Sequence, residues 1–436
     1  MKGKYKRINS FAIPLFLNNI TALIIGLCDA AIVGRVSTEA FASVTLIANT
    51  INSIVGVLGS VSLALNIIGA KLKGKNDEKQ LKENMTFHIV LDLIIGIVSF
   101  ILIAMFSKIF LKNIYHLTDQ ILKEGIRYLI IFSLSIIINL LLFTNSAYLK
   151  IKEKTKYILI GNLTASIINV VLDYILVFGK FGMPKLGMIG NAIGSVIALL
   201  VNLLIYAIVI KKEYLIKINK NKFIEIFKET KRISWPIMAQ EFLESTLIIT
   251  IMNSIISSIG LLQVSIYNMV NSIIQIVLMV MYAYGQTSLN FISEDLGKND
   301  IENLKRIPKE CEFMALVFYM VFGCIFIIYR RYLASLLSND TILILEVIRY
   351  IPMVIVINIF NLINTILKYS LQAIGKSKWV FNISLLLNMI LFIGVFISIR
   401  LIGNKIIFVY IGLFIYYVIL SIVFKKKYYK SLEEVV

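Results

Sequence analysis

The stretch Gly74-Lys75-Asn76-Asp77 separates two long apolar segments, and the same four residues return as Gly297-Lys298-Asn299-Asp300, 223 residues later. Two further pairs of landmarks keep nearly this offset: Pro14 with Pro236, and Lys154-Thr155-Lys156-Tyr157 with Lys376-Ser377-Lys378-Trp379. Landmarks that recur at one spacing across 436 residues predict a duplicated frame. Repeated halves in a membrane protein are typical of transporters whose site lies between the repeats.

The composition excludes an ordinary soluble protein. Hydrophobic residues make up 58% of the chain and charged residues 16%, whereas a soluble domain is about one quarter charged. Apolar runs long enough to cross a bilayer alternate with short lysine-rich connectors. Backbone groups in lipid must bond within their own segment, so these runs are predicted to be helices. The chain is therefore predicted to be an all-α polytopic membrane protein.

Twelve transmembrane helices are predicted, six in each half. They cover residues 11–34, 41–70, 83–110, 124–149, 156–178, 187–211, 232–258, 262–290, 309–334, 342–372, 377–400 and 405–424. Because an even number of spans returns each half to its starting side, the two six-helix lobes are predicted to be related by pseudo-two-fold symmetry along the membrane normal. The predicted organisation is an N-terminal lobe (1–210), a cytoplasmic connector (211–231), a C-terminal lobe (232–424) and a cytoplasmic tail (425–436).

The net charge of +19 reflects membrane topology. Most lysine and arginine residues lie in the termini and in the loops on the same side of the membrane as the termini. By the positive-inside rule both termini are predicted to be cytoplasmic. A nucleic-acid partner would need a basic face on a soluble fold, and no domain-length stretch of mixed composition is present.

Motifs of known enzymes are missing from the sequence. Gly375-Lys376-Ser377 resembles part of a phosphate-binding loop, but Ser370 stands where that motif requires glycine. The three cysteines and two histidines show no metal-binding spacing. The chain is predicted not to be an enzyme and to need no cofactor, so that transport would draw on an ion gradient.

Two aspartates lie inside predicted spans at a similar depth. Asp29 is 18 residues into the first span and Asp173 is 17 residues into the fifth. Asn169 lies one turn from Asp173 on the same face. A charge in hydrocarbon is costly and calls for a reason, and two carboxyl groups with an amide can hold a proton or a small hard cation. The alternative is that each aspartate reaches interfacial water or bonds a neighbouring helix.

The seventh span carries a second acidic pair. Glu241 and Glu244 are three residues apart and share one helix face. A functional role and a structural pairing are both open for them. Lys368, near the inner end of the tenth span, is expected to extend its ammonium group to the membrane surface.

Several of these segments together resemble the multidrug and toxic compound extrusion (MATE) family. The matching segments are Pro14 with Asp29 and Gly34-Arg35, Gly69-Ala70 before the repeated turn, Asn169-x-x-x-Asp173, Gly187 to Ala192, and Trp235-Pro236 followed by Phe242-Leu243-Glu244. The order of these segments covers nearly the whole chain. The resemblance implies two six-helix lobes around a central cleft that opens to one side at a time. It also implies export of organic, often cationic, compounds in exchange for protons or sodium ions.

The resemblance also implies site residues. Asp29, Asn169 and Asp173 match the first-lobe cation site of the family, and Asn191 stands where many members carry a small residue, so it is expected to add a ligand. Glu244 matches a second-lobe glutamate, but its tenth-span partner position holds Asn361, which is not acidic. Glu241, Glu244 and Asn361 are therefore expected to contact substrate or to form only an incomplete second site.

The leading hypothesis is an efflux antiporter coupled to protons or sodium ions. The runner-up is a flippase for a lipid-linked sugar or cell-wall precursor, which would need cations to hold a pyrophosphate. A structural or receptor-like membrane protein is the third class. The expected setting is the inner membrane of a prokaryote, with a small-molecule substrate, a monomeric chain and no obligate protein partner. Asp29 and Asp173 stand at the repeat positions of Ile251 and Val395, so the ion chemistry is expected in the first lobe.

Overall fold

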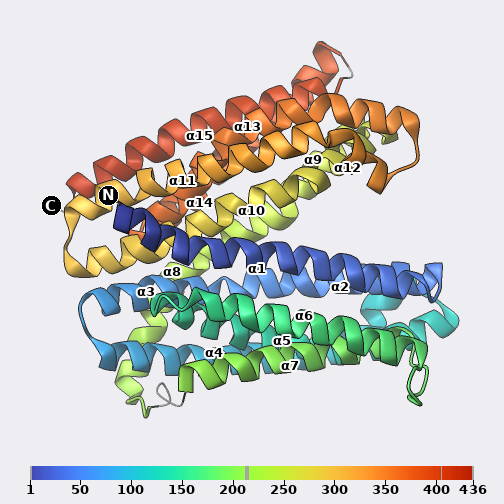
Figure 1. Cartoon of the computed structure of the whole chain (residues 1–436), viewed down its shortest axis with the longest axis horizontal. Helices are drawn as coiled ribbons and strands as arrows, with labels where there is room; N and C mark the ends of the chain where they lie inside the picture. The colour runs from blue at the N-terminus through green and yellow to red at the C-terminus, as the bar shows by residue number, and fades with distance from the viewer. Residues whose placement is uncertain (1, 212–215, 404, 435–436) are drawn as a thin grey trace. The chain divides into compact units, whose positions relative to one another are not determined.

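The computed structural model describes residues 2–211, 216–403 and 405–434 of the chain. Within these ranges the regular secondary structure is helical and contains no strand. Long helices run side by side in each half of the chain (Figure 1). The predicted all-α fold class is confirmed. Residues 212–215 of the predicted connector and 435–436 of the predicted tail lie outside the described residues.

The helices follow the apolar runs of the sequence. The first half forms α1 (Lys2–Gly34), α2 (Thr38–Gly59), α3 (Val61–Gly74), α4 (Glu78–Asn113), α5 (Asp119–Ile151), α6 (Thr155–Phe178) and α7 (Met188–Ile210). The second half forms α8 (Lys220–Phe242), the π-helix η2 (Leu243–Leu247), α9 (Ile248–Ser257), α10 (Leu261–Lys298), α11 (Ile301–Ile328), α12 (Arg330–Leu337), α13 (Thr341–Ala373), α14 (Ser377–Leu401) and α15 (Ile407–Glu433).

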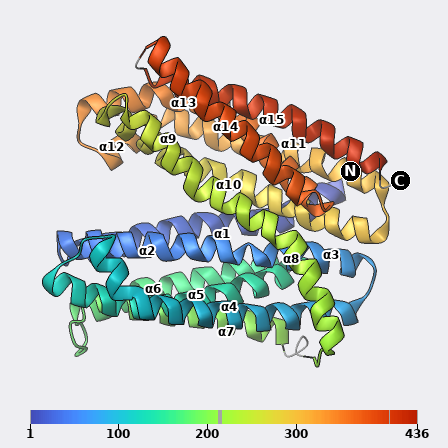
Figure 2. The ribbon, with the colours of Figure 1, turned by 180° about the vertical axis from the view of Figure 1, so that it is seen from behind.

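Eleven helical stretches of the described chain are long and apolar enough to cross a membrane. They correspond to eleven of the twelve predicted spans. The predicted seventh span, 232–258, is instead divided among α8, η2 and α9, which follow one another without a loop (Figure 2). The predicted second span changes direction at Ser60, between α2 and α3, and the predicted ninth span is interrupted at Tyr329, where α12 begins.

The chain divides into two compact units. One, here called the N-unit, comprises Leu17–Ser234, and the other, the C-unit, comprises Met1–Phe16 together with Trp235–Val436. Both boundaries fall inside a helix, α1 or α8, close to the prolines of the repeat. The division of the sequence into lobes at residues 210 and 232 remains a prediction. By packing, the start of α1 groups with the second half of the chain.

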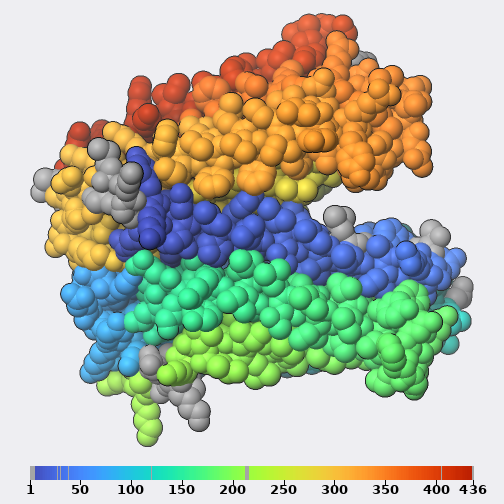
Figure 3. Space-filling view, in the orientation of Figure 1, coloured from blue at the N-terminus to red at the C-terminus, as the bar shows by residue number. Residues whose placement is uncertain are grey.

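Specific contacts hold the first sixteen residues in the C-unit. The Arg7 guanidinium donates to the buried Glu294 carboxylate at 3.1 Å and lies 4.4 Å from the centre of the Phe291 ring. The ring of Phe11 lies 5.0 Å from that of Phe291. Figure 3 shows the start of α1, in dark blue, against the yellow and orange residues of α10 and α11. A buried carboxylate without this arginine would be costly, which favours the arrangement.

The first part of α8 packs in the N-unit. Phe223 places its ring 4.8 Å from that of Phe87 on α4. His88, fully buried beside Phe87, makes a ring-nitrogen hydrogen bond of 2.8 Å with the Asn84 carbonyl. Thr230 of α8 lies within 3.5 Å of the other ring nitrogen. The basic helix that follows the connector is thus attached to α4 by aromatic packing and a polar contact.

The repeated Gly-Lys-Asn-Asp turn has the same structure in both halves. Asn76 and Asn299 both adopt the left-handed conformation, with φ of 58°, which asparagine tolerates better than most residues. Asp77 Oδ1 accepts from the Gln80 amide at 2.9 Å, and Asp300 Oδ1 accepts from the Asn303 amide at 3.0 Å. Each aspartate therefore caps the helix that follows the turn.

Removing either cap is expected to destabilise the protein. Asp77→Ala and Asp300→Ala should each cost about 1 kcal/mol, because the first-turn amide loses its acceptor. A melting-temperature assay on purified protein measures the loss. The matched controls are Asp77→Asn and Asp300→Asn, which keep a capping oxygen and should melt close to the unmodified chain. Equal losses for alanine and asparagine would contradict the capping role.

Candidate functional site

The two predicted aspartates meet in the N-unit. Asp29 lies on α1 and Asp173 on α6, and their carboxyl groups are within hydrogen-bonding range of each other. Asp173 is fully buried, and Asp29 is partly buried. Ionised carboxylates only accept hydrogen bonds, so a direct bond between the two needs one proton. We call the residues Asp29 and Asp173 the acidic pair.

A chain of hydrogen bonds orients the acidic pair. The Asn191 amide nitrogen, on α7, donates to Asp173 Oδ2 at 2.6 Å. The Tyr128 hydroxyl, on α5, donates to Asn191 Oδ1 at 3.3 Å. Tyr128 is 1% exposed and belongs to the apolar core formed by α1, α2, α4, α5 and α7. Packing of this core therefore sets which end of the Asn191 amide faces Asp173.

Two oxygens of the acidic pair have no donor in the described part of the chain. They are Asp29 Oδ1 and Asp173 Oδ1, and both atoms are buried. Buried polar atoms are nearly always hydrogen-bonded, and an exception needs an explanation. A proton or a cation between the two carboxyl groups would satisfy these oxygens.

Close approach of α6 and α7 depends on glycine at two places. A Cβ on Gly194 would lie 2.3 Å from Asp173 Oδ1. A Cβ on Gly190 would lie 2.7 Å from the carbonyl carbon of Leu176. The missing side chains let Asp173 rest against α7 next to Asn191. The sequence showed both glycines on either side of Asn191, but spacing alone did not indicate which helix they face.

Polar side chains continue from the acidic pair along α6 and α7. Asn169, the third predicted residue, donates to Ser195 Oγ of α7 at 3.3 Å. Farther along, Asn202 donates to Asn162, and Asn162 donates to Asn18 of α1. The α6 members recur at helical spacing, at positions 162, 166, 169 and 173. That spacing was visible in the sequence, whereas Tyr128, Ser195 and Asn18 required the fold.

A second polar cluster lies in the C-unit. Lys368 of α13 donates to Glu244 Oε2 at 2.6 Å, and Gln240 donates to Glu244 Oε1. Glu241 lies within electrostatic range of both Glu244 and Lys368. The expectation that Lys368 extends to the membrane surface is wrong, because its side chain is only 12% exposed and forms an ion pair. A buried carboxylate attracts a nearby cation more strongly than the surface does.

The Glu244 cluster borders a cavity of about 180 Å³ within the C-unit. Asn361, the predicted tenth-span residue, lines this cavity and donates to Asn358 Oδ1 at 2.9 Å. The structure therefore brings Glu244 and Asn361 to the same cavity. Glu244 is also the second residue of the π-helix that divides the seventh predicted span. Single π-turns occur frequently at functional sites.

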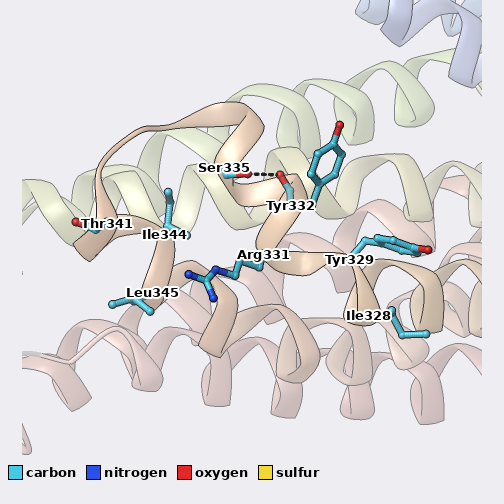
Figure 4. A pocket seen from close by; sticks show the side chains of 8 residues that line it. All are labelled: Ile328, Tyr329, Arg331, Tyr332, Ser335, Thr341, Ile344 and Leu345. Atoms are coloured by element: carbon cyan, nitrogen blue, oxygen red, sulfur yellow. Dashed lines mark hydrogen bonds between the residues drawn. The ribbon is translucent and has the colours of Figure 1, made fainter.

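A larger hollow of about 540 Å³ is open to the surface beside α12 (Figure 4). Exposed tyrosines at 329 and 332, the arginine at 331 and apolar residues of α11 and α13 form its wall. Tyrosine, arginine and apolar side chains together are typical of the membrane–water interface. Among the described residues there is also no group of three or more His, Cys, Asp or Glu side chains that could hold a metal ion.

A sequence model of the MatE family matches the chain twice, over residues 14–175 and 236–397. The two matched segments begin at Pro14 and Pro236 and have the same 222-residue offset at both ends. The duplicated frame predicted from three landmarks is thereby confirmed over most of each half.

Curated relatives share this length and character. "Probable multidrug resistance protein NorM" of Neisseria meningitidis serogroup B is 24% identical over 76% of this chain and 73% of its own. "Uncharacterized transporter YisQ" of Bacillus subtilis is 22% identical over 84% of this chain and 81% of its own.

Solved structures share the fold. A multidrug resistance MATE family transporter of the MOP superfamily in an outward-facing conformation matches with a TM-score of 0.89 at 15% identity, over 99% of this chain and 96% of its own. A MOP superfamily transporter from Pyrococcus furiosus, described as having a binding pocket of reverse polarity, matches with a TM-score of 0.88 over the same shares. At this identity the likeness shows the fold alone, and it agrees with the predicted two-lobe architecture.

Proposed function

Because the chain belongs to the MatE family of multidrug efflux transporters, we propose that it is a secondary active antiporter that exports organic compounds in exchange for protons. Members of this family are membrane transporters rather than enzymes. The observation that supports proton exchange is the acidic pair, Asp29 with Asp173, in which two buried oxygens lack a donor. Asn169 and Asn191 complete the proposed site.

The orientation of Asn191 favours a proton over sodium as the coupling ion. Its nitrogen faces Asp173, and its oxygen accepts from Tyr128. A sodium ion requires several oxygen ligands, and the nearby amide presents a donor instead. A proton shared by Asp29 and Asp173 needs no third oxygen. Exchange of that proton changes the charge of the site by one unit at a place where an uncompensated charge is costly.

Coupling follows if the protonated and the ionised pair favour different conformations. A ligand shifts a conformational equilibrium only by its difference in affinity for the two states. Proton binding at the acidic pair would favour one orientation of the transporter, and binding of substrate would favour the other. Alternating access then moves a proton inward for each exported substrate.

Ion-gradient flux in proteoliposomes tests the proposal. The purified chain is reconstituted, and uptake of ethidium, a fluorescent organic cation, is followed after an acidic lumen or a sodium-loaded lumen is imposed. We expect the acidic lumen to drive uptake, because protons leave as ethidium enters, and the sodium gradient at equal pH to drive none. Uptake driven only by sodium would assign sodium to the acidic pair. No uptake with either gradient would contradict the proposed antiport.

The C-unit supports a proposal of a single ion site. Glu244 already has Lys368 as its cationic partner, and Asn361 lacks a carboxylate. The flippase alternative is not favoured, since the family match is to multidrug transporters. A prokaryotic inner membrane, cytoplasmic termini and a monomeric state complete the proposal.

A further inference from the structure

The cavity beside Glu244 is large enough to hold a small organic molecule. Its volume of about 180 Å³ exceeds that of an engineered protein cavity of about 150 Å³ that binds benzene. Side chains from η2, α10, α13, α14 and α15 line it, and all of them belong to the C-unit. The cavity is thus separate from the acidic pair of the N-unit.

The polar lining of this cavity offers free acceptors. Asn364 and Asn388 are 3% and 1% exposed, and the Oδ1 atom of each is buried without a donor in the described chain. Their amide nitrogens are engaged elsewhere. Asn364 donates to the Tyr417 carbonyl at 2.9 Å, and Asn388 donates to the Tyr416 hydroxyl at 2.9 Å. A ligand that satisfied this lining would have to bring hydrogen-bond donors.

The charge of the cluster favours a cation. Glu241 and Glu244 carry two negative charges when ionised, and Lys368 supplies one positive charge. The Lys368 ammonium also lies 5.6 Å from the centre of the Tyr369 ring, where a cation is attracted to the ring face. A second position beside Tyr369 is therefore close at hand for this ammonium if another cation takes its place on Glu244.

The backbone at Glu244 departs from a regular helix. Residues Leu243–Leu247 form the π-helix η2, between α8 and α9. A π-turn is less stable than α-helix and is retained mostly where it positions a side chain for function. The ligand-sized cavity, the two free amide oxygens and the π-turn are independent observations, and they converge on one side chain.

We propose that this cavity is a binding site for a compact organic cation with N–H donors, and that the cation displaces the Lys368 ammonium from Glu244. The ligand's N–H groups then bond Glu244 and the Oδ1 atoms of Asn364 and Asn388. Lys368 acts as a tethered counter-ion, which neutralises Glu244 when the site is empty. The inference concerns a site in the C-unit and does not depend on the coupling role proposed for Asp29 and Asp173.

Equilibrium binding tests the site. The probe is radiolabelled benzylammonium, a one-ring amine that suits the cavity volume, and benzyl alcohol is the neutral competitor of similar shape. The purified full-length chain in detergent should bind benzylammonium saturably, and excess benzyl alcohol should not displace it. Glu244→Gln should weaken binding at least about tenfold, since it removes the charge that the probe pairs with.

The sharper test is Lys368→Gln, because the two roles of Lys368 predict opposite signs. If Lys368 competes with the probe, its removal should raise the affinity for benzylammonium about tenfold. If the ion pair serves only to hold the helices, Lys368→Gln should leave affinity unchanged or lower it, which would overturn the proposal. The matched control is Lys376→Gln in the exposed pair that Lys376 forms with Glu434 at 3.2 Å. That variant should bind like the unmodified chain.

A third variant separates binding from folding. Asn388→Leu removes one free oxygen and leaves Glu244 and Lys368 unchanged, so it should weaken benzylammonium binding severalfold even if the Glu244 variant fails to fold. Unchanged binding in a folded Asn388→Leu chain would overturn the assignment of this cavity. Failure of ethidium antiport with intact benzylammonium binding would contradict only the proposed antiport.

Discussion

Asp173→Asn is expected to abolish ethidium uptake driven by an acidic lumen. An asparagine at this position keeps the size of the side chain but cannot share a proton with Asp29. Coupling between two ligands is typically worth about 1–3 kcal/mol, equivalent to a roughly 5- to 150-fold change in affinity. Without it the gradient no longer biases the direction of transport. The initial rate in reconstituted vesicles measures the loss.

Asp29→Asn should have the same effect, because one proton joins the two carboxyl groups. The double variant should be no worse than either single variant, since the residues act as a unit. Exchange of ethidium between two sides at equal pH provides the control for folding, because it requires no net proton movement. Gradient-driven uptake at the unmodified rate in both single variants would contradict the role of the acidic pair.

Gly190→Ala is expected to produce the largest loss of stability. Its added methyl group would lie 2.7 Å from the Leu176 carbonyl carbon and 2.9 Å from the Val177 nitrogen. These are backbone atoms, which cannot rotate aside, so α6 and α7 must separate. Overpacking of this kind typically costs about 1–3 kcal/mol. The separation would also move Asn191 away from Asp173, so transport should fall together with the melting temperature.

The matched control for Gly190→Ala is Gly56→Ala. Gly56 lies inside α2, and a Cβ there would meet nothing within 4 Å. Alanine is the better helix former by about 1 kcal/mol, so this variant should melt no lower than the unmodified chain. A comparable loss at both positions would show that helical glycine is needed for a reason other than the approach of α6 to α7.

Much of the fold was predictable because its causes are local or periodic. A run of about 20 apolar residues forms a helix in lipid wherever it occurs, so eleven of the predicted spans coincide with helices. The seventh did not, because the π-turn at Leu243–Leu247 depends on the surroundings of Glu244. The start of α1 likewise joins the C-unit through Arg7 and Glu294, whose pairing spans 287 positions of sequence.

The candidate site divides in the same way. The depth of Asp29 and Asp173 in their spans was countable, and their meeting followed from equal depth on two helices. The identity of the side chains that orient them was not countable. Tyr128 reaches Asn191 because the apolar core rotates α5 toward α7, and Gly194 gives Asp173 its space. Lys368 was assigned to the membrane surface, because counting along one helix does not show a carboxylate on another.

The sequence by itself determined that this is a duplicated membrane protein with helices joined by capped turns, since hydrophobic length and turn chemistry act within a few residues. Tertiary structure alone decided which polar side chains become partners. Each helix sets the face on which a side chain lies, but the rotation of neighbouring helices and the closeness of their backbones depend on packing across the unit. That packing placed Asn191 on Asp173 and Lys368 on Glu244.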